Sequence, residues 1–173
     1  MAAEPRLEHF ADDGTFPNSQ LPLLIYEAAM APDEASPEAM EALFARNGWS
    51  PQWRSSIYDF HHYHSRSHEA LGIARGRATV MLGGPEGREF DIQMGDVVVI
   101  PGGVAHRRLT ASEDFLVVGA YPPGQEEWDL LRGDPGDRDK AQKNLAELEL
   151  PKTDPVGGAG GALMKVWREA AAG

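Results

Sequence analysis

The segment from Trp53 to Tyr121 constrains the fold most strongly, because it is a succession of short β-like runs separated by Gly and Pro. Apolar and polar side chains alternate through Arg88–Met94, as in a strand with one buried face. Val97–Ile100 is apolar throughout and predicts a fully buried strand. We therefore predict an all-β block whose apolar faces point into a barrel. The predicted strands are Arg54–His64, Glu69–Arg75, Arg77–Leu82, Arg88–Met94, Val97–Ile100, His106–Thr110 and Phe115–Tyr121.

The regions on either side of this block have a different character. Residues 1–19 are polar and predict a surface arm, which leads into a first strand at Leu21–Ala28. A Ser-Pro pair and apolar residues at helical spacing predict a capped amphipathic helix over Asp33–Asn47. Beyond the block, helical elements are predicted around Glu126–Leu131, over Asp137–Leu148 and in the last apolar turn. The fold class is therefore mainly β with a few peripheral α-helices.

The last apolar turn, Leu163–Trp167, follows a Gly-rich stretch, and leaving its side chains in water would be costly. We expect it to dock on the barrel or on a second subunit. Met164 and Trp167 could instead cap the mouth of a pocket, but packing as core is favoured. Trp49 and Trp53 are likewise interpreted as core.

A single domain spanning 1–173 is predicted from the length and from the lack of an internal repeat. Residues 1–48 form its N-terminal arm, strand and helix. Residues 49–123 form the barrel, and 124–173 form the C-terminal helices and tail.

Charge and cysteine content exclude several classes of partner. Sixteen Lys and Arg against 27 Asp and Glu give a net charge of −11, which disfavours both nucleic acid and anionic membranes. Without cysteine there is no disulfide and no thiolate ligand, so a metal would have to use imidazole, carboxylate or water. Because no apolar leader or membrane-spanning run is present, we expect a cytoplasmic location.

Four of the six histidines lie within Asp59–Glu69, and this density points to a metal site. Residues two apart on a strand share a face, so His62 and His64 present two imidazoles to one point. A turn then brings Glu69 to the start of the next strand. A Pro-Gly-Gly turn returns the chain at His106, which places a third imidazole beside the pair.

Two histidines of the cluster are assigned other roles, and a surface function of the whole cluster is the alternative. His61 faces away from its neighbour and should lie outside the site. His68 points away from the interior if Glu69 faces in, so we predict that it either supports a metal ligand from behind or lies at the surface. A lone histidine is more often a surface feature than a ligand.

The spacing of these residues resembles the two motifs of the cupin superfamily. His62-x-His64, then four residues and Glu69, then six residues and Gly76, is similar to the first motif. The stretch that begins at Gly95, continues through Pro101-x-Gly103 and ends at His106 is similar to the second. The resemblance implies a double-stranded β-helix, or jelly-roll, barrel that holds one divalent transition metal on His62, His64, Glu69 and His106. It does not choose among Fe, Mn, Ni, Co and Zn.

Further segments resemble the YjlB-type bacterial single cupins. They are the His-Tyr-His-Ser run, Gly72–Gly76, Gly133–Gly136 and Asp154–Val156. The second motif departs from the superfamily pattern at its end, where Thr110 stands in place of Asn. Because single cupins are commonly dimers, the resemblance also implies a homodimer.

Alternation along the strands extends the site to a ligand pocket. Continuing from His106 places Arg108 and Thr110 on the inward face, and working back from His62 places Tyr58 and Phe60 there. A guanidinium suits a bidentate carboxylate, so we hypothesise that Arg108 clamps an anionic group of a small ligand. The alternatives are an ion pair with a neighbouring acid, or a bulge that reverses the facing.

The leading functional hypothesis is a metal-dependent enzyme acting on a small, anionic organic molecule. Dioxygenase-type oxidation is ranked ahead of isomerisation and hydrolysis, and Tyr58 or Tyr63 could serve as a general base. The alternative is a non-catalytic barrel that binds or senses a metal and a metabolite. A barrel that has lost its metal is disfavoured because all four ligands are present. Fold alone does not decide between them.

Overall fold

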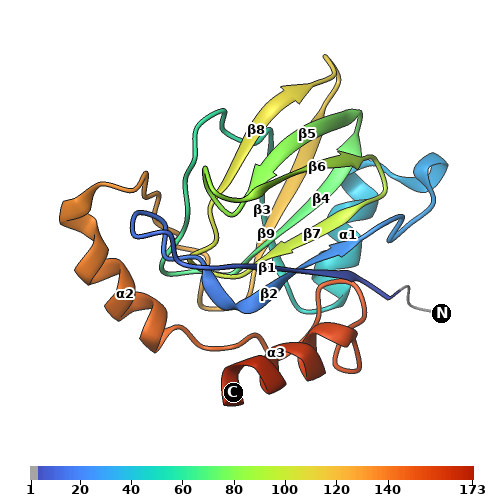
Figure 1. Ribbon diagram of the computed structural model, residues 1–173. Coiled ribbons are helices and arrows are strands. Elements are labelled where there is room, and N and C mark those ends of the chain that lie inside the picture. The colour runs from blue at the N-terminus through green and yellow to red at the C-terminus, as the bar shows by residue number, and fades with distance from the viewer. Residues whose placement is uncertain (1–3) are drawn as a thin grey trace.

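A computed structural model describes residues 4–173, in which two antiparallel sheets face each other (Figure 1). The larger sheet has the order β1-β2-β7-β4-β9-β3 and the smaller the order β6-β5-β8. This is the jelly-roll arrangement that the sequence predicts. The strands are β1 Arg6–Phe10, β2 Ser19–Tyr26, β3 Ser50–Ser55, β4 Glu69–Arg75, β5 Arg77–Leu82, β6 Arg88–Gln93, β7 Val97–Ile100, β8 His106–Ala111 and β9 Leu116–Tyr121.

The main core fills the space between the two sheets. Alternate side chains of β2, β4, β7 and β9 meet those of β5 and β6 there. On β6, Phe90 and Ile92 are buried while Glu89 and Asp91 are exposed, which confirms the predicted alternation. One end of this space contains polar residues in place of apolar ones, and the candidate site lies at that end.

A second core covers the outer face of the larger sheet. Helices α1 (Pro37–Arg46) and α3 (Ala162–Ala172) pack on this face, so β7 is buried on both sides (Figure 1). Ser36 caps α1 by accepting a hydrogen bond from the Ala39 backbone N–H at 3.0 Å. Gly72 lets the helix approach closely, because a Cβ there would lie 2.8 Å from the Met40 sulfur.

The C-terminal apolar turn docks on the larger sheet as helix α3. Trp167 is 1% exposed, and its indole N–H donates to the Pro22 carbonyl at 2.8 Å. Met164 packs in the same core cluster. The interpretation of both residues as core is confirmed, and neither lines the cavity described below.

Three local expectations are wrong. Part of the predicted surface arm is strand β1, which pairs with β2. The predicted strand Arg54–His64 ends at Ser55, and the following segment makes only an isolated bridge at His62. Glu126–Leu131 forms no helix, because Asp129 and the backbone of Leu131 bond to the loop before β4 instead.

The remaining helical segments follow the prediction. The helix expected over Asp137–Leu148 is α2, Arg138–Glu147. Short 3₁₀ turns at Pro32–Glu34 and Pro135–Asp137 precede α1 and α2. Within residues 4–173, no helix has both the length and the apolar character needed to cross a membrane.

Candidate metal centre

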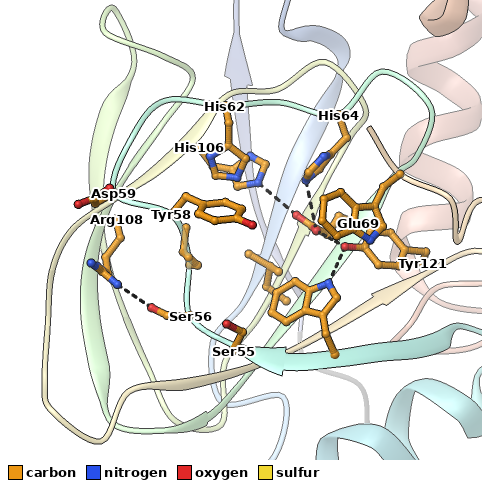
Figure 2. A pocket seen from close by; sticks show the side chains of 14 residues that line it. Ser55, Ser56, Tyr58, Asp59, His62, His64, Glu69, His106, Arg108 and Tyr121 are labelled. Atoms are coloured by element: carbon orange, nitrogen blue, oxygen red, sulfur yellow. Dashed lines mark hydrogen bonds and ion pairs between the residues drawn. The ribbon is translucent and has the colours of Figure 1, made fainter. Parts of the chain in front are cut away.

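Three buried imidazoles converge at one end of the barrel (Figure 2). Each of His62, His64 and His106 offers a ring nitrogen, and these three atoms lie within 4.8 Å of one another. His106 is the first residue of β8, and its backbone exchanges hydrogen bonds of 3.2 and 2.9 Å with that of His62. This backbone bridge joins two residues that are 44 positions apart in the sequence and brings their imidazole rings together. Three such imidazoles could hold a metal ion.

Backbone carbonyls determine which nitrogen of each ring faces the centre. Nδ1 of His62, His64 and His106 lies 2.9, 2.5 and 3.1 Å from the carbonyl oxygens of Phe60, Asp129 and Val104. A carbonyl can only accept, so each Nδ1 carries the proton and donates it. In a neutral ring the Nε2 lone pair is then free to bind a metal, and the carbonyl holds the ring in orientation.

Glu69 completes the group from the first position of β4. Its side chain is buried, with Oε1 at 3.1 Å from Nε2 of His106 and Oε2 at 3.4 Å from Nε2 of His64. Two ligand atoms that each lie about 2.1 Å from one ion at right angles are roughly 3.0 Å apart, which matches these separations. The negative Glu69 oxygens would repel the lone pairs of the imidazole Nε2 atoms unless a proton or a cation lay between them. The residues therefore fit a divalent metal.

Charge and burial tune the protonation of this group. Burial, helped by the nearby His106, lowers the pKa of His62 to about 2, so this ring stays neutral. Burial also opposes charge on His64 and Glu69, but their mutual attraction and hydrogen bonding outweigh it. The pKa of His64 is raised, and that of Glu69 is held well below its usual value. The carboxylate is therefore ionised at neutral pH.

A hydrogen-bond chain fixes Glu69 from behind. The Trp53 indole N–H donates to the Tyr121 hydroxyl at 2.7 Å, and that hydroxyl lies 2.7 Å from Oε2 of Glu69. Indole can only donate, so the Tyr121 proton is directed to the carboxylate. Gly119 makes room for this arrangement, because a Cβ there would lie 2.1 Å from the Trp53 ring. Trp53 is only half-buried and lines the cavity, so its interpretation as simple core is incomplete.

The segment after β9 holds the loop that carries His62 and His64. The Asp129 carboxylate accepts from the Ser65 backbone N–H at 2.7 Å and from the Ser65 hydroxyl at 2.5 Å. Its carbonyl accepts from His64, as described above. Trp128 places its ring against His64, with ring centres 5.3 Å apart, and lines the cavity. This segment therefore builds one wall of the site and orients one of its imidazoles.

A cavity of about 430 Å³ opens from the four side chains. Two of the predicted ligand-binding residues, Tyr58 and Arg108, line it. Phe60 does not; it stacks on Tyr58 with ring centres 4.9 Å apart. Thr110 is exposed on the outer face of the smaller sheet, so its predicted inward facing is wrong.

A bulge explains the position of Thr110. It pairs with Thr79, whereas Arg108 pairs with the next residue of β5, Val80. Leu109 is therefore the extra residue on β8, and alternation reverses after it. The predicted facing holds for Arg108 and fails beyond the bulge.

The other residues of the histidine cluster lie outside the cavity. His61 packs against Phe16, with ring centres 5.7 Å apart, as expected for a residue outside the site. His68 is 2% exposed, so the surface position considered for it is wrong; its Nδ1 accepts from the Gly102 backbone N–H at 2.9 Å. Tyr63 is 1% exposed within a separate apolar cluster, which leaves only Tyr58 of the two tyrosines at the cavity.

The cavity residues that the sequence alone does not single out include Tyr121 and Trp128. Alternation along β9 carries a usable signal for Tyr121, because Val117 points into the main core and residue 121 shares its face. No such signal exists for Trp128, since its segment has no regular structure. Its position depends on hydrogen bonds to residues far away in the chain.

No protein-family model matches the chain. It is 38% identical over 168 residues to the uncharacterised protein YjlB of Bacillus subtilis (strain 168), an alignment that covers 96% of this chain and 99% of YjlB. A DUF861 family protein of Thermotoga maritima matches 50% of this chain and 91% of its own, with 22% identity and a TM-score of 0.33. The acireductone dioxygenase of Bacillus anthracis, solved with a cadmium ion, matches 49% and 56%, with 19% identity and a TM-score of 0.34. The near-complete match to YjlB shows that this protein belongs to the YjlB family, and its two facing sheets have the jelly-roll arrangement that its cupin-like motifs predict.

Proposed function

We propose that this protein is a metal-dependent enzyme acting on a small, anionic organic molecule, with dioxygenase-type oxidation favoured over isomerisation or hydrolysis. The observation that carries the proposal is the convergence of three Nε2 atoms and the Glu69 carboxylate at the base of an open cavity. A substrate entering the cavity would meet the metal directly.

His62, His64, Glu69 and His106 would hold the metal. Three neutral imidazoles and one carboxylate leave a divalent ion with one net positive charge, and the set suits Fe, Mn, Ni, Co or Zn. When bound, the metal would polarise a chelated substrate as a Lewis acid or, if it is iron, activate dioxygen. The chain's own groups then have to bind and orient the substrate.

Arg108 supports the choice of an anionic substrate. Its guanidinium lines the cavity and donates to the Ser56 hydroxyl at 2.9 Å. Among residues 4–173 no carboxylate lies within 4.0 Å of it, so the alternative of an ion pair with a neighbouring acid is not formed there. A guanidinium without an acid partner, beside a metal site, suits the carboxylate of a ligand.

The walls of the cavity leave Glu69 only 3% exposed, and one cavity side chain can exchange a proton with a ligand. Trp53, Tyr121 and Trp128 surround the carboxylate with aromatic rings. Tyr58 is half-exposed and lines the same cavity, and its hydroxyl is the candidate proton donor or acceptor. The cytoplasmic location and the homodimer stay predictions.

Elemental analysis combined with oxygen uptake tests this function. We expect protein purified without added metal to contain one equivalent of iron and to consume oxygen with at least one of a panel of small carboxylates. Glu69→Gln should abolish the uptake, whereas Glu34→Gln, at an exposed site outside the cavity, should not change it. Stoichiometric zinc without uptake would contradict the oxygenase and favour non-redox chemistry or binding alone.

A further inference from the structure

Tyr58 is 49% exposed although its ring lies beside the buried His62. It is the most exposed of the large apolar and aromatic side chains recorded in residues 4–173. An aromatic ring kept in water at the edge of a cavity suits contact with a ligand. Contacts with neighbouring side chains also hold the Tyr58 ring in place.

Two side chains stack behind Tyr58 and hold it in place. The Phe60 ring lies 4.9 Å from it at an angle of 22°, and the Arg132 guanidinium carbon lies 3.7 Å above the Phe60 ring. Neither Phe60 nor Arg132 lines the cavity, whereas Tyr58 does. Phe60 therefore covers one face of the Tyr58 ring, while the Tyr58 side chain still lines the cavity.

Tyr58 lies between two groups that can hold the ends of a ligand. Figure 2 shows Tyr58 between the hydrogen-bonded pair Arg108 and Ser56 on one side and the side chains of the metal centre on the other. Trp53 and Trp128 add further aromatic walls. A ligand spanning the cavity would have a flat, apolar middle and polar groups at both ends.

We infer that the ligand is a planar carboxylate, aromatic or conjugated, which stacks on Tyr58 and places its carboxylate against Arg108. This inference rests on the proposed function, because the other end of the ligand is directed to the metal.

A matched set of probes separates ring shape from charge. Benzoate and cyclohexanecarboxylate have similar size and the same charge but differ in planarity, and benzamide keeps the flat ring without the charge. On the full chain loaded with Zn²⁺, we expect calorimetry to show benzoate binding about 3- to 10-fold more tightly than cyclohexanecarboxylate, the range expected for an aromatic pair. Benzamide should bind more weakly than both.

Variants assign these preferences to residues. Tyr58→Leu should remove the preference for benzoate, and Tyr58→Phe should keep it, because only the ring is required. Arg108→Gln should weaken both carboxylates without changing benzamide. Arg77→Gln, at an exposed arginine outside the cavity, is the matched control and should change none of them.

Equal binding of benzoate and cyclohexanecarboxylate, no binding of either at millimolar concentration, or an unchanged preference in Tyr58→Leu would overturn the inference. The zinc content of the same samples separates this failure from that of the proposed function. If zinc is bound stoichiometrically but benzoate does not bind more tightly than cyclohexanecarboxylate, only the inference of a planar ligand is wrong. If zinc is not retained, the proposed function fails as well.

Discussion

His106→Ala is expected to lower the affinity for divalent metal by at least about 100-fold, because loss of a group that only supports a metal ligand already costs about 10- to 100-fold. The substitution removes one of three converging nitrogens and also a neighbour of Glu69. Metal content after dialysis, measured by mass spectrometry, should fall from one equivalent to a small fraction.

The control for this prediction is His9→Ala, which removes an exposed histidine on β1 and should leave the metal content unchanged. The metal-free forms of both variants should unfold within a few degrees of the metal-free wild type, which separates loss of the site from loss of the fold. Retention of a full equivalent of metal by His106→Ala would show that the ion binds elsewhere.

Asp154→Ala is expected to cost about 3–5 kcal/mol of unfolding free energy, because it leaves two buried and two partly buried donors without an acceptor, at about 1–3 kcal/mol for each buried one. Asp154 is fully buried. Its carboxylate accepts from the Tyr26 hydroxyl and from the backbone N–H groups of Val156, Gly157 and Leu163, the last at the start of α3. The side chain therefore ties the larger sheet to the helix that covers it.

Denaturant unfolding of the metal-free protein, with chelator present, measures this loss without a contribution from metal binding. Asp33→Ala, at an exposed aspartate before α1, is the matched control and should change stability by no more than about 0.5 kcal/mol. A loss below 1 kcal/mol in Asp154→Ala would mean that the buried donors find other acceptors.

The strands and the shared facing of His62 and His64 could be predicted because they depend on short-range rules. Grouping Glu69 and His106 with them also required the spacing of the two motifs. Alternation and Gly-Pro punctuation locate β4, β5 and β7 at their observed bounds. The pairing of His62 with His64 needs only that residues two apart share a face. The two side chains share a face although their segment is not a regular strand, because the isolated bridge between His62 and His106 gives the segment strand-like pairing at that point.

The parts that could not be predicted depend on one extra residue and on long-range hydrogen bonds. The bulge at Leu109 has no signal in the sequence, and it reverses the facing of Thr110 while Arg108 keeps its own. Glu126–Leu131 has apolar spacing that suits a helix, but Asp129 bonds instead to a loop 64 positions earlier. The helix propensity of this segment is outweighed by contacts that form only in the folded chain.

The roles of Trp53 and Tyr121 show a different limit. Aromatic residues in a β-protein are usually core, and these two do pack at the barrel interior. Their importance lies in the directed hydrogen bonds from Trp53 to Tyr121 and from Tyr121 to Glu69. Such a chain depends on side-chain geometry, which no spacing rule describes.

Anomalous diffraction from crystals of the full chain grown with Mn²⁺ tests the central claim most directly. We predict one anomalous peak per chain, within bonding distance of Nε2 of His62, His64 and His106 and of a Glu69 oxygen. A peak at any other place, or no peak at saturating Mn²⁺, would contradict the assignment of these four residues as the metal centre.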